Sequence, residues 1–133
     1  MPSISSKISG DDLYGEDLTG VTHERVEFVD VDLTESTSAS GLVLRDCVFR
    51  QVRFNVSTHT GAAFLNCLFS GCSFFDATFT ECKFVGSTFE GCTYDQMKVI
   101  GGDLSFVALP GADLRKVSFA GAHARGRPDR GAL

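Results

Sequence analysis

The spacing of the phenylalanines constrains the fold more than any other feature of this 133-residue chain. From Phe49 to Phe89, a phenylalanine stands at every fifth position except position 59, where the residue is His59. Phe119 continues this series, and Phe28 joins it once a shift of one residue is allowed, so ten of the twelve phenylalanines share one slot. A single repeated structural position therefore organises most of the chain.

Two other residue classes keep the same period. Two positions before the large residue stands a small or medium one, and all five cysteines belong to this set. Two positions after the large residue stands a glycine, and twelve of the fourteen glycines occupy this slot. Before position 36 the large slot is one residue out of phase with the later series. One extra residue within positions 36–41 accounts for this shift. The early large slots are Ile8, Leu13, Leu18, His23, Phe28 and Leu33.

A period of five matches neither the 3.6-residue period of a helix nor the two-residue period of a strand. In an extended segment the small and large slots, two residues apart, point to the same side. The next inward residue comes three positions later, so the chain must turn a corner, where glycine tolerates unusual backbone angles. We therefore expect a solenoid whose coils stack about 4.8 Å apart and whose inward faces form one continuous core.

Several quintets resemble the A(D/N)LXX unit of pentapeptide-repeat proteins, namely ADLRK at 112–116, GDLSF at 102–106 and EDLTG at 16–20. The resemblance implies an all-β fold, a right-handed quadrilateral parallel β-helix with four quintets in each coil. It runs over residues 6–126, which give about six coils. The expected organisation is an N-terminal extension at 1–5, one β-helix at 6–126 with a register shift near 36–41, and an irregular basic tail at 127–133.

Composition limits the class of protein. The chain is 43% hydrophobic and 22% charged, as globular proteins are. Its apolar runs are only a few residues long, too short to span a membrane. The N-terminus has no basic region followed by an apolar stretch, so a secretory signal is not expected. We expect a soluble, cytoplasmic protein.

No residue pattern indicates catalysis. The cysteines form no CxxC pair and share a slot with Ala, Val and Ser, which indicates structural free thiols. His23 and His59 take large inward slots, either as hydrogen-bonded core residues or as local distortions, and the segment 57–60 around His59 alternatively marks a side that bulges outward. No second histidine or carboxylate stands at a spacing that completes a triad or a metal site. We expect no enzyme activity, no metal and no cofactor.

Charge is unevenly distributed along the chain. Residues 1–46 hold ten acids and three bases, a net charge of −7, and residues 47–114 are at −2. The last nineteen residues carry five bases and one acid, a net charge of +4. The formal charge of −5 is thus an average over a dipolar rod.

An acidic rod can resemble duplex DNA to a protein that binds DNA electrostatically. Members of the pentapeptide-repeat family of the Qnr and MfpA types are DNA mimics that bind DNA gyrase and protect it from quinolones. The resemblance therefore implies DNA gyrase or another topoisomerase as the partner, resistance to gyrase inhibitors as the outcome, and no direct contact with nucleic acid. The candidate acidic surface consists of Asp11, Asp12, Glu16, Asp17, Glu24, Glu27, Asp30, Asp32 and Glu35.

Two other interpretations stay open. The carboxylates alone would keep a solenoid soluble without any partner. Alternatively, the chain is a protein-interaction scaffold that uses an exposed apolar strip. Leu65 and Val85 occupy outward slots one coil apart, and they form the candidate strip.

The repeat pattern stops after Ala124, and the tail that follows has no large apolar residue before Leu133. Such a tail is a poor cap for an open coil, and natural solenoids cap their ends. We therefore hypothesise a truncated or frameshifted member of a longer repeat protein. An open end also favours a homo-oligomer formed by coil-end stacking.

Overall fold

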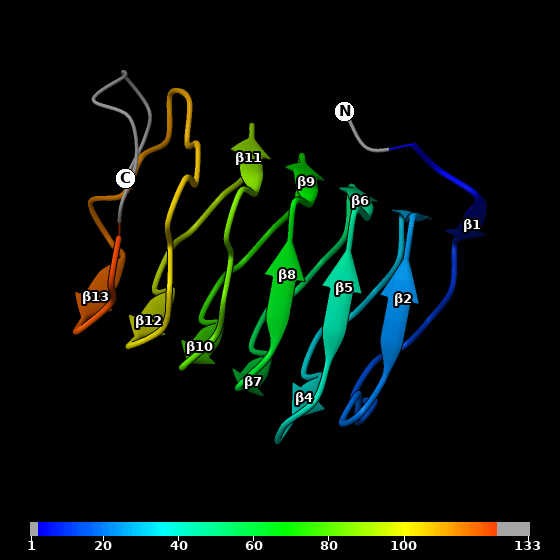
Figure 1. Cartoon of the computed structure of the whole chain (residues 1–133), viewed down its shortest axis with the longest axis horizontal. Coiled ribbons are helices and arrows are strands. Elements are labelled where there is room, and N and C mark those ends of the chain that lie inside the picture. The colour runs from blue at the N-terminus through cyan, green and yellow to red at the C-terminus, as the bar shows by residue number, and fades with distance from the viewer. Residues whose placement is uncertain (1–2, 125–133) are drawn as a thin grey trace.

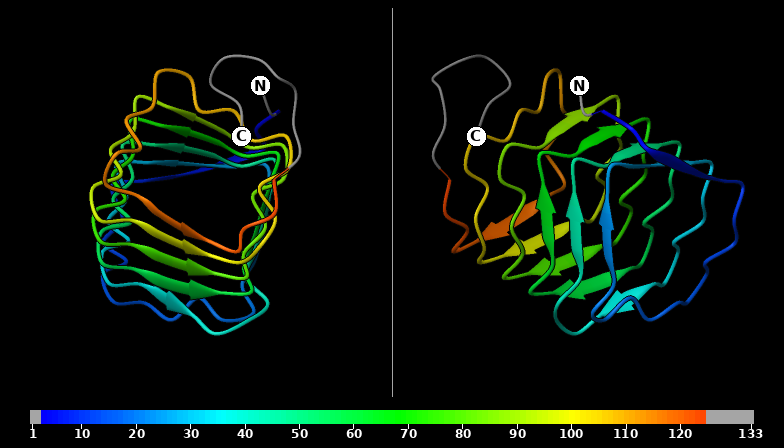
Figure 2. Two further views of the ribbon diagram at one scale, coloured as in Figure 1. Left: turned by 90° about the vertical axis from the view of Figure 1, so that its left-hand side faces the viewer. Right: turned by 45° about the vertical axis from the view of Figure 1, so that its right-hand side comes forward.

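The computed structural model describes residues 3–124, which contain parallel strands and no helix. The chain winds as a solenoid from the first coil to the sixth, and successive coils lie side by side along its length (Figure 1). Viewed toward the end of the rod, the coils superpose around one common interior (Figure 2). The predicted fold class, a parallel β-solenoid of about six coils, is confirmed.

Each coil has four sides, which we call faces A to D in chain order. Face B is held by isolated bridges that link residues 12, 32, 53, 73 and 93, and faces A, C and D carry strands. Face A consists of β1 (Ser6–Ser9), β3 (Val26–Val29), β6 (Val48–Arg50), β9 (Leu68–Ser70) and β11 (Thr88–Glu90). Face C consists of β4 (Thr37–Ser38), β7 (Thr58–Thr60), β10 (Thr78–Thr80), β12 (Lys98–Ile100) and β13 (Ser118–Ala120). Face D consists of β2 (Thr22–Glu24), β5 (Val43–Arg45) and β8 (Ala63–Leu65).

The pairing register locates the extra residue of the second coil. Asp17 pairs with Thr37, twenty residues later, whereas Thr22 pairs with Val43, twenty-one residues later. From the third coil onward, paired residues are again twenty positions apart, as Thr58 and Thr78 are. The additional residue therefore lies between positions 38 and 42, on face C.

A left-handed backbone conformation at every fifth residue turns the corners. Positive φ occurs at eleven glycines of this slot and at eleven other residues, which include Val56 (φ 58°) and Phe106 (φ 60°). Glycine adopts such angles freely, whereas a side chain makes them costly. The glycine period in the sequence thus marks the corners, but half of the corners are built without glycine.

Stacked aromatic rings fill the interior. Phe28, Phe49, Phe69 and Phe89 form one stack under face A, with centroid distances of 4.9, 4.8 and 4.5 Å. Nine of the ten phenylalanines in the repeated slot are buried. The expectation that all ten are buried is wrong for Phe119, which is 43% exposed because it lies in the sixth coil, at the end of the described chain.

His59 is the largest polar residue of the core. It is fully buried, its Nδ1 lies 2.8 Å from the Ser38 hydroxyl, and its ring stacks on Phe79. The alternative that this side bulges outward is therefore wrong. Within residues 3–124, no buried side-chain nitrogen or oxygen lacks a hydrogen-bond partner. The same residues include no helix that is long and apolar enough to cross a membrane. The predicted basic tail at 127–133 lies outside the described residues.

Candidate functional site: the N-terminal acidic surface

The nine candidate carboxylates surround the first two coils instead of forming a single stripe. Asp12 and Asp32 lie on face B, Asp17 on face C, Glu24 on face D and Glu27 on face A. Asp30 and Glu35 stand at corners, each with positive φ. The remaining two, Asp11 and Glu16, are exposed neighbours of Asp12 and Asp17.

Arginines of the adjoining coils neutralise four of these carboxylates. Arg50 Nε lies 2.8 Å from Glu27 Oε2, and Arg53 Nη1 lies 3.0 Å from Asp30 Oδ1. Arg53 also approaches Asp32 at 3.9 Å, and Arg45 approaches Glu24 at 3.8 Å. The sequence analysis missed these pairs, although each arginine follows its acid by 21 to 23 residues, which is one coil.

The other five carboxylates have no cationic partner within residues 3–124. Asp11 and Asp12 lie on face B of the first coil, Glu16 and Asp17 on face C, and Glu35 at the corner between these faces in the second coil. We call this group the acidic edge. Because it lacks neutralising arginines, it is the part of the candidate surface with the strongest negative field. The acidic edge consists of Asp11, Asp12, Glu16, Asp17 and Glu35.

Local hydrogen bonds hold the acidic edge in place. Asp12 Oδ1 accepts the Tyr14 backbone N–H at 3.1 Å, and Asp17 Oδ1 accepts the Thr19 N–H at 2.9 Å and its hydroxyl at 2.6 Å. The Tyr14 hydroxyl donates to Glu35. The Thr19 hydroxyl and N–H lower the pKa of Asp17, so this carboxylate is ionised at neutral pH. The hydrogen bond to Glu35 raises the pKa of Tyr14, which keeps the phenol protonated.

The two residues of the candidate apolar strip lie on adjacent coils. Leu65 ends β8 on face D, and the N–H of Asn66 donates to the carbonyl of Val85 at 3.0 Å. Both side chains are half-buried, so they expose less apolar surface than Phe75, which is 50% exposed.

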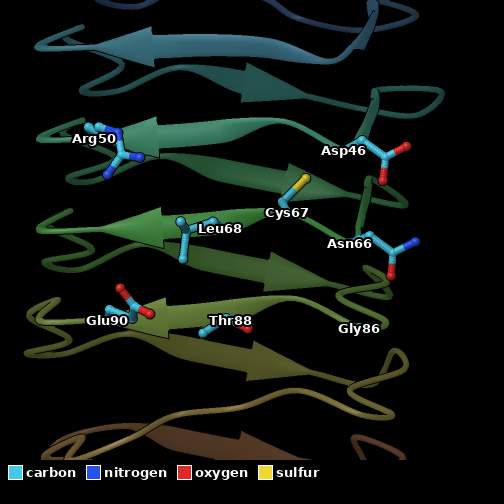
Figure 3. A pocket seen from close by; sticks show the side chains of 8 residues that line it. All are labelled: Asp46, Arg50, Asn66, Cys67, Leu68, Gly86, Thr88 and Glu90. Atoms are coloured by element: carbon cyan, nitrogen blue, oxygen red, sulfur yellow. The ribbon is translucent and has the colours of Figure 1, made fainter. Parts of the chain in front are cut away.

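A shallow groove of about 510 Å³ crosses face A over β6, β9 and β11 and was not predicted. Asp46 and Asn66 stand at one side of it, and Arg50 and Glu90 stand at the other (Figure 3). Arg50 is already paired with Glu27. The Cys67 thiol at the groove is buried and donates to the Leu44 carbonyl at 3.2 Å. This mixed and partly neutralised lining holds no nucleophile with an adjacent base.

The inward cysteines have a structural role that composition does not show. Their thiols donate to main-chain carbonyls of the preceding coil, as in Cys82 to His59 at 3.3 Å and Cys72 to Phe49 at 3.3 Å. Ser87 does the same toward Phe64 at 2.9 Å. Burial raises the pKa of Cys82 to about 11, which keeps that thiol protonated and unreactive at neutral pH.

The described residues hold no group of three or more histidine, cysteine, aspartate or glutamate side chains that is arranged to bind a metal ion. His59 and His23 are both held against aromatic rings, and Phe79 and Phe28 are their respective neighbours. Burial lowers the pKa of His59 to about 4. The chemistry that this surface offers is thus ionic attraction to a cationic partner.

Comparison with known proteins connects part of the chain to a family. A family model described as pentapeptide repeats (8 copies) matches residues 60–92. No protein of curated description matches the sequence.

Solved structures with a similar fold include three repeat proteins. Full-length QnrB1, a plasmid-mediated fluoroquinolone resistance protein, is 16% identical over 91% of this chain and 92% of its own, with a TM-score of 0.33. Rfr23 from the cyanobacterium Cyanothece 51142 is 10% identical over 92% of this chain and 81% of its own, with a TM-score of 0.28. HetL from Nostoc sp. strain PCC 7120, a protein involved in heterocyst differentiation regulation, is 11% identical over 90% of this chain and 84% of its own, with a TM-score of 0.25.

Proposed function

Since the chain is a pentapeptide-repeat protein, with the repeats recognised at 60–92 continued by the coils on both sides, we propose that it is a non-enzymatic binding protein. Its partner is a protein that binds DNA electrostatically, DNA gyrase or a related topoisomerase. The acidic edge occupies the partner's cationic surface in place of DNA, and the consequence is resistance to quinolones or other gyrase inhibitors.

One observation carries this proposal: the five carboxylates of the acidic edge lie together without a cationic partner in the described part of the chain. Carboxylates presented in this way attract a basic groove, and the attraction weakens as salt is raised. Within the candidate surface, the pairing of Glu24, Glu27, Asp30 and Asp32 with arginines confines this attraction to the acidic edge.

A supercoiling assay tests the proposal. Purified gyrase is given relaxed plasmid and ATP, with and without a quinolone, at increasing concentrations of this protein. We expect micromolar protein to change gyrase activity, and a variant with Asp11→Asn, Glu16→Gln and Glu35→Gln to require at least about tenfold more protein, because it loses three charges. Amides keep the acceptor oxygens, so the fold is retained.

A matched variant controls for net charge. Glu81→Gln, Glu90→Gln and Asp95→Asn remove the same three charges from the fourth and fifth coils, and none of these acids has an ion-pair partner in residues 3–124. This variant should act like the wild type. If both variants lose the effect on gyrase equally, that effect depends on net charge and not on the acidic edge. If wild-type protein at micromolar concentration has no effect on gyrase, the proposal is contradicted.

A scaffold function through the apolar strip is the second candidate. It is favoured by the position of Leu65 and Val85 on adjacent coils of one face, both partly exposed. If the supercoiling assay is negative, Leu65→Ala and Val85→Ala should remove a partner that wild-type protein captures. Self-association through the coil ends is likewise a proposal.

A further inference from the structure

Both ends of the described solenoid expose its apolar interior. At the N-terminal end, Leu13, Leu18, Val21 and His23 line an apolar opening that reaches to Phe28. At the C-terminal end, Leu109, Leu114, Val117 and Phe119 line a second opening that has no polar wall. Phe119 is 43% exposed, whereas Phe79 in the same column is 1% exposed, so the sixth coil lacks the cover that an interior coil receives.

The two openings match because every coil repeats the same slots. On face C, one inward column begins at Leu18 and ends at Phe119. Between them it contains Ser38, His59, Phe79 and Val99, each paired with the next. One further coil step beyond Phe119 would place a second copy's Leu18 on it. By the same step, Leu13 of that copy would cover Leu114.

The backbone at the two ends has no further partner within the part of the chain that the structure describes. Among these residues, β1 pairs only with β3, and β13 pairs only with β12. The outer side of each strand therefore presents free N–H and C=O groups, which are a template for adding another strand. The strand direction is parallel throughout, so a copy stacked head to tail continues the existing sheets.

Charge selects which ends meet. Asp11, Asp12, Glu16 and Asp17 are exposed on faces B and C of the N-terminal coil. Lys116 lies on the sixth coil, and it has no ion-pair partner within residues 3–124. Arg115 beside it is held by Asp113 at 2.7 Å. Two acidic ends repel each other, whereas an acidic end and the end that carries Lys116 attract.

We propose that copies of this chain stack head to tail, with the first coil of one copy on the sixth coil of the next. This proposal rests on coil-end self-association and does not depend on gyrase. The contact is heterologous, so the product is an open rod that grows with concentration and not a closed dimer. Leu18 of one copy packs on Phe119 of its neighbour, and Asp17 stands over Ser118, two residues from Lys116, as Lys98 stands over Thr78 beside Asp76.

Two end-blocked variants test the direction of stacking, with mass measured by sedimentation in the full-length chain. Leu18→Asp blocks the N-terminal end, and Phe119→Asp blocks the C-terminal end. Each alone should be a monomer, and an equimolar mixture should give a 1:1 complex that does not grow further. Phe75→Asp, which adds the same charge at an exposed side position of the fourth coil, should leave the wild-type rods intact.

Other results would overturn the proposal. Dimers of Phe119→Asp alone would indicate contact between two N-terminal ends, and dimers of Leu18→Asp alone would indicate contact between two C-terminal ends. A wild-type mass that stays monomeric up to high concentration at low salt would exclude stacking altogether.

A charge exchange covers the case in which an end-blocked variant does not fold. Lys116→Glu and Asp17→Lys should each raise the concentration for half-assembly at least about tenfold at low salt, and their combination in one chain should restore assembly. No rescue would contradict the pairing of these ends. Lys116→Glu keeps the acidic edge, so its effect on gyrase reports on the proposed function separately from stacking.

Discussion

The corner residue shows how one position controls the path of this chain. Five-residue sides need a left-handed backbone at each corner, and Val56 adopts φ 58° there although valine is β-branched. A left-handed conformation costs a residue with a side chain roughly 1–2 kcal/mol. Val56 is 42% exposed, so its side chain recovers little of that cost by burial. Val56 is therefore a site of stored backbone strain.

Replacing Val56 by glycine should raise the free energy of unfolding by about 1 kcal/mol, because glycine adopts positive φ without strain. The reverse change, Gly91→Val, should lower stability by a similar amount, since Gly91 has φ 61° and a Cβ placed there meets no atom within 4 Å. Denaturant unfolding measures both. If the two variants shift stability in the same direction, side-chain contacts and not backbone angle decide the effect.

At the scale of elements, β4 and β7 show how the second and third coils accommodate an imperfect repeat. Ser38 takes a large inward slot in β4, next to the extra residue, and leaves space that a phenylalanine repeat would fill. His59 in β7 fills it and is hydrogen-bonded by Ser38 at 2.8 Å. The small residue and the histidine are thus one compensating pair.

This pair predicts a pH dependence of stability. Burial lowers the pKa of His59 to about 4. An unfolded histidine titrates near 6.5. The unfolded chain therefore binds a proton that the folded chain rejects, and stability should fall by about 2 kcal/mol from pH 7 to pH 5 through this residue.

His59→Phe should flatten the stability profile between pH 5 and pH 7, whatever its effect on stability at pH 7. His123 is exposed, and His123→Gln should leave the contribution of His59 to the slope unchanged. Thermal unfolding at a series of pH values measures the slopes. An unchanged slope in His59→Phe would show that another group controls this pH range.

At the scale of the whole molecule, each coil contacts only its neighbours, so stability varies along the rod. The third and fourth coils carry fully buried rings on every side, with Phe54, Phe64, Phe69 and Phe74 at most 1% exposed. In the first coil, Leu13 and Leu18 are only half-buried. Unfolding should therefore begin at an end.

Hydrogen exchange should be slowest for backbone amides of residues 49–84 and fastest for the first and sixth coils. Mass spectrometry of peptides from monomeric protein at high salt measures this profile. If the proposed head-to-tail stacking occurs, protection of the two end coils should rise at low salt while the central coils stay unchanged. Uniform protection along the chain would contradict the expectation that the end coils unfold before the central coils.

The fold was largely predictable, because a period of five leaves one way to bury the large residue and requires a corner after it. The candidate site was predictable only in part. Composition placed the acids at the N-terminal end, but it did not show that Arg50 and Arg53 neutralise Glu27 and Asp30. It also assigned the cysteines to filling space and missed their thiol hydrogen bonds, for example from Cys82 to His59.

The sequence by itself determined the slots: which residues face inward and where the chain turns, since these depend on spacing along the chain. The four-sided coil, and with it the number of coils, came from the family resemblance. Only the tertiary structure decided which residues of different coils meet, because outward side chains one coil apart follow no fixed pattern. That stacking confines the unpaired carboxylates of the N-terminal surface to the acidic edge, pairs Ser38 with His59 and leaves Leu18 and Phe119 as matching ends of the rod.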